Sequence, residues 1–254
     1  MSRLPTLDAL GISIPSSVDA TQVAAEWLGQ FSGHVKARDV DGIMDLFQGD
    51  AFWRDLLALT WDFRTFDGEE MIKTFLRDRL PATGMNNVAL GDFIQFQQPF
   101  PDMVWVAFTF KFETDVGIGS GVVRLVPTSS GAWKAHTMFT NLEELKGHPE
   151  QVGQHRSRAV VSGRQWLESR KREVDFEDGD QPAVLIIGAG HCGLELAARL
   201  KYLGVPTLVV EKNVNIGDTW RERYDALCLH WPVCTFIEML AQVHREAEVA
   251  VYRV

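Results

Sequence analysis

The stretch from residue 183 to residue 213 constrains the fold more than any other part of the sequence. It has the sequence AVLIIGAGHCGLELAARLKYLGVPTLVVEKN, in which an apolar run is followed by three glycines, Gly188, Gly190 and Gly193. A continuous apolar run is typical of a parallel strand that is covered on both faces. The GxGxxG spacing predicts a tight turn at Gly188, close approach of a phosphate group at Gly190, and close helix–strand contact at Gly193.

The residues after the glycines predict a helix and a second strand. One side of the helix carries three leucines: Leu196, Leu200 and Leu203. Gly204 then provides the end of the helix. The apolar stretch 207–210 predicts the second strand, and Glu211 follows it 23 positions after Gly188. A spacing of about 20 places a carboxylate at the ribose hydroxyls of a bound dinucleotide.

The first part of the chain predicts helices followed by strands. Apolar residues recur at helical spacing in three segments, the last of which begins after Gly68 and stops before Pro81. The three stripes are Val23, Trp27 and Phe31; Ile43, Leu46 and Phe47; and Met71, Ile72, Phe75 and Leu76. After Pro81 the period changes to two, which predicts an antiparallel meander with strands near 104–112, 118–126 and 133–140. We therefore expect an α+β cone, in which a curved sheet wraps around the helices.

A change in composition predicts the boundary between these two parts. Residues 154–172 are rich in Arg, Ser and Gln, and an acidic run that ends at Pro182 follows them. Such a charge run is typical of a solvated helix and linker. We expect a cone at 1–153, a helix and acidic linker at 154–181, and an α/β unit at 182–254.

The overall composition limits the classes of partner. The formal net charge of -9 provides no basic surface for a phosphate backbone or an anionic lipid, so we expect no nucleic-acid and no membrane partner. The three cysteines, Cys192, Cys228 and Cys234, form no CxxC pair, which argues against a disulfide framework and against a metal site. A reducing, cytoplasmic location fits this pattern best.

Several motifs together resemble flavin-containing, Baeyer-Villiger-like monooxygenases that carry a SnoaL-like domain in front. The similar segments are the glycine turn, Gly217-Asp218-Thr219-Trp220, Arg223-Tyr224 and, in the first part, Phe52-Trp53-Arg54-Asp55. The resemblance implies a SnoaL-like α+β cone followed by a partial Rossmann-like FAD-binding unit. It also implies that FAD, reduced by NADPH, oxygenates a small organic substrate with O2.

The resemblance also assigns residues to the cofactor. Gly188, Gly190 and Gly193 would contact the FAD pyrophosphate, and Glu211 the adenosine ribose. Gly217 and Trp220 match the segment that lines the flavin, whereas Arg223, Tyr224 and His230 receive no chemical role. Members of the family continue much further and carry a second GxGxxG for NADPH, which this sequence does not contain. We therefore expect a truncated chain with no NADPH-dependent oxygenase activity of its own.

Two alternatives place the function in the cone. In the first, the cone is a SnoaL-like lyase, isomerase or small-ligand-binding module, because such cavities can use a His and Asp pair for proton transfer. The candidate groups are His34, Asp55, Asp62 and His136. In the second alternative, the cone is a folding or dimerisation module, which predicts a possible homodimer through the N-terminal domain.

Overall fold

The computed structural model describes residues 4–13, 17–152, 155, 168, 171–172, 181–223 and 251–253. The chain divides into two compact units, Met1–Gly147 and His148–Val254, and each is described by itself. Most of the expected linker at 154–181 lies outside the described residues, as do Tyr224 and His230. In the described part, no helix is long and apolar enough to cross a membrane.

The first unit is built on a six-stranded sheet with the order β2-β1-β6-β5-β4-β3. Its strands are β1 (Phe47–Leu56), β2 (Phe63–Asp67), β3 (Asn86–Phe100), β4 (Met103–Glu113), β5 (Gly117–Pro127) and β6 (Trp133–Leu145). The strands β4 to β6 form the predicted antiparallel meander, and β3 extends it by pairing antiparallel with β4. The meander prediction missed β1, β2 and β3, and β1 runs parallel to β6, so the sheet is mixed.

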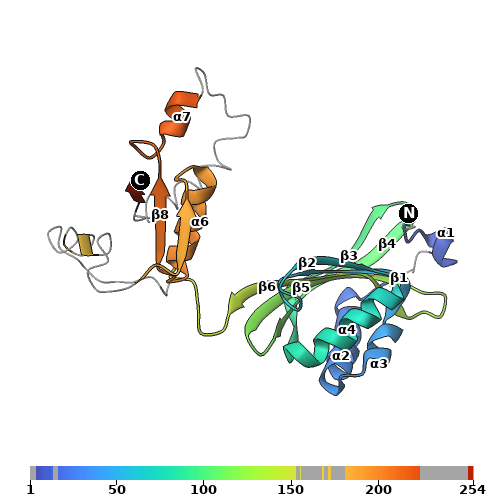
Figure 1. Cartoon of the computed structure of the whole chain (residues 1–254). Coiled ribbons are helices and arrows are strands. Elements are labelled where there is room, and N and C mark those ends of the chain that lie inside the picture. The colour runs from blue at the N-terminus through green and yellow to red at the C-terminus, as the bar shows by residue number, and fades with distance from the viewer. Residues whose placement is uncertain are drawn as a thin grey trace. The chain divides into compact units, whose positions relative to one another are not determined.

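Four helices belong to this unit: α1 (Leu7–Leu10), α2 (Ala20–Ala37), α3 (Val40–Asp45) and α4 (Glu69–Thr83). Figure 1 shows α2, α3 and α4 on one face of the sheet. Aromatic side chains fill the space between these helices and the sheet: Trp27 stacks on Phe31 with ring centroids 5.2 Å apart, and Phe47 stacks on Trp53 at 5.7 Å. The α+β prediction is confirmed, and the interior of the unit is a packed aromatic core.

Two predicted boundaries are wrong. The helical stripe that was expected to include Phe47 ends earlier, because α3 stops at Asp45 and Phe47 is the first residue of β1. Helix α4 was expected to stop before Pro81, yet it includes Pro81 and ends at Thr83, followed by the left-handed Gly84. Burial of one side of α4, including Leu76 and Leu80, outweighs the local preference against an internal proline.

The second unit contains a small parallel sheet. Strand β7 (Val184–Ile187) leads into α6 (His191–Tyr202), and the chain returns in β8 (Thr207–Glu211) parallel to β7. A third strand, β9 (Val251–Arg253), pairs in parallel with the other edge of β8. The order β7-β8-β9 therefore places β8 in the middle.

Helix α6 buries only part of the predicted leucine stripe, because Leu200 packs against the core cluster of this unit whereas Leu203 is exposed. Ala197 and Ala198 are buried, whereas Leu196 is 48% exposed. Small side chains allow the helix to lie close to the sheet, where Ala197 packs with Ile186 and Val209. The end of α6 is also tied to the residues that open this unit, because the backbone N–H of Gln151 donates to the carbonyl of Tyr202 at 2.6 Å.

Candidate functional site

The glycine turn between β7 and α6 is the candidate site of the second unit. Its three glycines meet three different physical demands. Gly188 has a φ of +102°, a backbone conformation that side chains other than glycine rarely adopt. At Gly193, an added Cβ would lie 2.0 Å from the carbonyl oxygen of Gly188. Gly188 and Gly193 are therefore required by the turn itself and by the contact between helix and strand.

Gly190 is different, because nothing in the described protein requires a glycine there. Its φ is -75°, and an added Cβ would meet no described atom within 4 Å. Gly190 is the N-cap of α6, and the first turn of α6 carries no acidic side chain. The N-terminus of a helix attracts anions through its N–H groups and its dipole. The turn thus leaves open space at the end of a helix that suits a phosphate group.

Glu211, the last residue of β8, is bonded to this turn. One carboxylate oxygen accepts from the N–H of Ala189 at 2.6 Å and the other from the N–H of Asn213 at 2.9 Å. These backbone hydrogen bonds, from Asn213 first and then from Ala189, lower the pKa of Glu211. A carboxylate has about four acceptor positions, so acceptor capacity remains for ribose hydroxyls. The sequence predicted an acid at this point but not its bond to the turn.

The segment after β8 ends in α7 (Asp218–Arg223), which includes Trp220. The side chain of Trp220 lies outside the described residues. Gly217 has a φ of +87°, so the backbone itself favours glycine there. Sequence reasoning gave no role to Asp218, which is buried and accepts from the N–H of Asn215 at 2.7 Å and from Arg221 at 2.6 Å. The N-cap pattern does not predict this role, because the backbone N–H that donates to Asp218 belongs to Asn215, which precedes it, and not to the first turn of α7.

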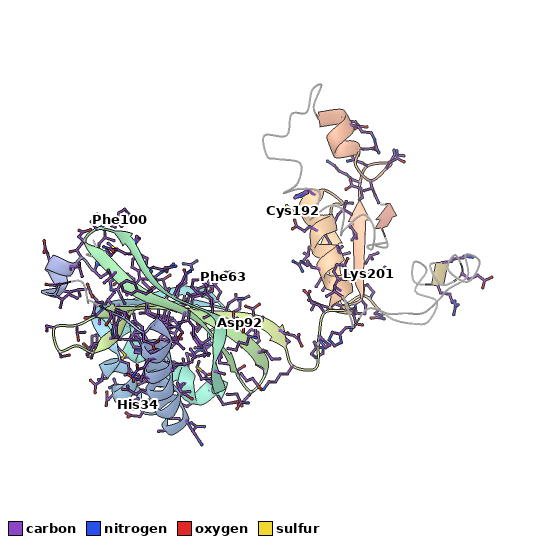
Figure 2. The ribbon with its side chains drawn as sticks, turned by 180° about the vertical axis from the view of Figure 1, so that it is seen from behind. His34, Phe63, Asp92, Phe100, Cys192 and Lys201 are labelled. Atoms are coloured by element: carbon purple, nitrogen blue, oxygen red, sulfur yellow. The ribbon has the colours of Figure 1, made fainter. Side chains whose placement is uncertain are left out.

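Cys192 lies at the start of α6 and is exposed, while Lys201 lies near the other end of the same helix (Figure 2). The structure describes no cluster of three or more His, Cys, Asp or Glu side chains that could hold a metal ion within the ranges given above.

The polar candidates of the first unit have separate partners. His34, near the end of α2, places Nδ1 2.8 Å from the carboxylate of Asp39. Asp39 also accepts from the N–H of Gly42, and this bond, followed by the one with His34, lowers the pKa of Asp39. A Cβ on Gly42 would lie 2.2 Å from Nδ1 of His34, so the glycine makes room for the pair. The pair links the end of α2 to the start of α3.

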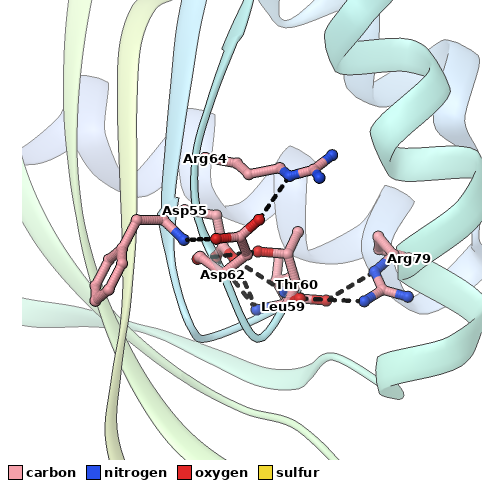
Figure 3. A network of polar contacts seen from close by, with 7 residues as sticks. Asp55, Leu59, Thr60, Asp62, Arg64 and Arg79 are labelled. Carbon is pink, nitrogen blue, oxygen red and sulfur yellow. Dashed lines mark hydrogen bonds and ion pairs between the residues drawn. The ribbon is translucent and has the colours of Figure 1, made fainter.

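Asp55 is fully buried in β1 and holds the loop between β1 and β2 (Figure 3). Its carboxylate accepts from the N–H groups of Leu59 and Thr60 and from the Thr60 hydroxyl at 2.7 Å. The hydroxyl of Thr140 donates to the other oxygen at 2.6 Å and accepts from Nε1 of Trp53 at 3.0 Å. With this many donors around it, the carboxylate is an acceptor that fixes the loop.

The side chains of Asp62 and His136 make no hydrogen bond with the Asp55 carboxylate, although the Thr60 hydroxyl contacts both that carboxylate and the backbone carbonyl of Asp62 (Figure 3). Asp62 accepts from Nε of Arg64 at 2.9 Å, and this bond is the main reason why its pKa is lowered. The pairing of β5 with β6 is irregular between Ala135 and Thr137, and His136 lies at this β-bulge. The ring of His136 is edge-on to the Phe52 ring, and its Nδ1 lies 3.8 Å from the Asp50 carboxylate. Burial lowers the pKa of His136, and Nδ1 is buried without a hydrogen bond among the described atoms. The structure therefore does not bring the four candidates together as a proton-transfer site.

Comparison with curated proteins finds short matches to oxidoreductases. The chain is 48% identical over 52 residues to indole-3-pyruvate monooxygenase YUCCA1 of Oryza sativa subsp. japonica, a stretch that covers 20% of the chain and 13% of the relative. It is 45% identical over 49 residues to an uncharacterized oxidoreductase, CzcO-like, of Geobacillus kaustophilus, with 19% and 14% covered. The match thus spans about an eighth of the length of these relatives. No family model matches the chain.

Comparison with solved structures finds proteins that align with about half of this chain. ActVI-ORFA from Streptomyces coelicolor has a TM-score of 0.39 and 14% identity, covering 50% of this chain and 98% of that chain. Nuclear transport factor 2 from Cryptosporidium parvum has a TM-score of 0.38 and 13% identity, covering 52% and 100%.

Proposed function

We propose that the second unit binds the adenosine diphosphate half of FAD, and that the chain functions in an FAD-dependent monooxygenase that oxygenates a small organic substrate with NADPH and O2. The short matches to a plant indole-3-pyruvate monooxygenase and to a bacterial oxidoreductase support this class of reaction. FAD supplies the redox chemistry when it is bound, and the protein binds and orients it. The residues proposed to hold it are Gly188, Gly190, Gly193 and Glu211, with Gly217 and Trp220 toward the flavin.

The observation that carries the proposal is the open space at Gly190. Gly188 and Gly193 are explained by backbone conformation and packing, whereas the open space at Gly190 leaves the backbone at the start of α6 accessible to a group from outside. A pyrophosphate at this position would lie against the N-terminal N–H groups of α6. The carboxylate of Glu211 ends the neighbouring strand and would accept hydrogen bonds from the ribose.

Calorimetric titration of the full chain with ADP tests the proposal. We expect Gly190→Val to weaken ADP binding at least tenfold, because the new side chain fills the phosphate space. Glu211→Ala should cost about 1.5 to 3 kcal/mol, the usual value of a hydrogen bond to a charged group. Gly33→Val is the matched control, because Gly33 also has open space around its Cα and lies in α2 of the other unit. Equal ADP affinity in all four proteins would remove these residues from the site.

A further inference from the structure

A cavity of about 600 Å³ lies between β2 and α4 in the first unit. One wall of the cavity is formed by Asp62, which directly precedes β2, and by Arg64 and Phe66 of β2. These three residues alternate along the chain, so their side chains lie on the same face of the strand. Helix α4 forms the opposite wall with Glu70, Met71 and Asp78, which recur at helical spacing. A cavity of this size matches the 300 to 1,000 Å³ (roughly) that small-molecule sites occupy.

Part of the cavity wall is aromatic and apolar. The ring of Phe66 stacks on that of Phe75, with centroids 4.1 Å apart and planes 15° from parallel. Both phenylalanines line the cavity together with Met71, which is 50% exposed. An apolar body can therefore be buried against this wall, and the face of an aromatic ring also attracts a cation.

The charges around the cavity are not balanced. Three carboxylates and two guanidinium groups line it, which leaves a net charge of -1. The carboxylate of Asp62 is paired with Arg64, and Arg79 donates to the carbonyls of Leu59 and Thr60. The structure gives the carboxylates of Glu70 and Asp78 no hydrogen bond and no ion pair with any residue that it describes. Unpaired negative charge therefore lies beside the aromatic wall.

The rim of the cavity is held rigidly by the loop between β1 and β2 (Figure 3). Leu57 and Trp61 have φ angles of 61° and 55°, which are strained for residues other than glycine. The bonds from this loop to Asp55, and the two bonds from Arg79 to its carbonyls, hold it in place. Strained residues persist where the surrounding structure fixes them, and a rim that is fixed in advance lowers the entropic cost of binding.

We propose that this cavity binds a small organic cation, an ammonium group on an aromatic or alkyl body. The ammonium lies on the acidic side of the cavity that Glu70 and Asp78 line, and the body packs on Phe66 and Met71. The site is separate from the glycine turn and does not depend on FAD binding.

NMR titration of the full chain with phenethylamine tests this proposal, with 2-phenylethanol as the neutral probe and 3-phenylpropionate as the anionic probe. We expect amide shifts confined to β2 and α4 with phenethylamine, at a dissociation constant of about 1 mM or below. The alcohol should bind more weakly and the anion not at all. Glu70→Gln and Asp78→Asn should each weaken amine binding by up to about fivefold, as the loss of an exposed charge pair does.

Glu69→Gln is the matched control, because Glu69 is exposed in the same turn of α4 but does not line the cavity. It should leave amine affinity unchanged. Equal affinity for the amine and the alcohol, an equal loss in Glu69→Gln, or shifts outside β2 and α4 would each overturn the proposal.

Discussion

Replacement of Thr140 by valine should destabilise the first unit strongly, although the two side chains have nearly the same volume. The hydroxyl of Thr140 links two buried groups, because it donates to the fully buried Asp55 at 2.6 Å and accepts from Nε1 of Trp53 at 3.0 Å. Valine removes both bonds and provides no replacement at a residue that is 0% exposed.

The size of the effect follows from the two lost bonds. A hydrogen bond to a charged group contributes about 1.5 to 3 kcal/mol, and a buried donor left without a partner costs about 1 to 3 kcal/mol. We therefore expect the free energy of unfolding to fall by about 2 to 5 kcal/mol, with allowance for partial relaxation. Loss of the bond to Asp55 should also loosen the loop that Asp55 holds.

Urea unfolding of the full chain, monitored by tryptophan fluorescence, measures this change. Thr137→Val is the matched control, because Thr137 lies in the same strand, is only partly buried and is not among the described residues that bond to Asp55. The control should change stability by less than about 0.5 kcal/mol. A cost for Thr140→Val no greater than that of Thr137→Val would refute the role assigned to the Asp55 network.

Two further predictions follow from the same structure. Because burial lowers the pKa of His136, the folded state binds its proton less readily than the unfolded chain, so the free energy of unfolding should decrease as the pH falls below about 6.5. His136→Phe should reduce this loss of stability at low pH, which urea unfolding at several pH values measures. The same dependence of the free energy of unfolding on pH in the variant and the wild type would contradict the reasoning. Gly193→Ala should push α6 away from the turn at a cost of about 1 to 3 kcal/mol, whereas Gly190→Ala meets open space. Hydrogen exchange of the α6 amides compares the two, and equal protection would contradict the packing argument.

Local patterns in the sequence predicted the elements that short-range interactions determine. The turn, α6 and β8 follow from the spacing of Gly188, Gly193 and Glu211, and the structure has a strand, a helix and a parallel strand there. The helices and the meander of the first unit follow from apolar periods of 3.6 and two.

Long-range pairing could not be predicted in the same way. The parallel contact of β1 with β6 and the bond between Asp55 and Thr140, 85 positions apart, depend on how the sheet closes. From its residue type alone, Asp55 was a candidate for acid–base chemistry. In the structure, its buried carboxylate accepts the hydrogen bonds that hold the loop between β1 and β2. The leucine stripe of α6 predicted the packing of Leu200 but not the buried positions Ala197 and Ala198, where close contact with the sheet requires small side chains.

Equilibrium binding of FAD and of FMN to the full chain tests the central proposal most directly. The two cofactors share the flavin, but only FAD carries the adenosine half that the turn and Glu211 are proposed to hold. The account predicts saturable FAD binding that ADP displaces, with FMN bound at least tenfold more weakly. Equal binding of FAD and FMN, or no FAD binding that ADP can displace, would contradict it.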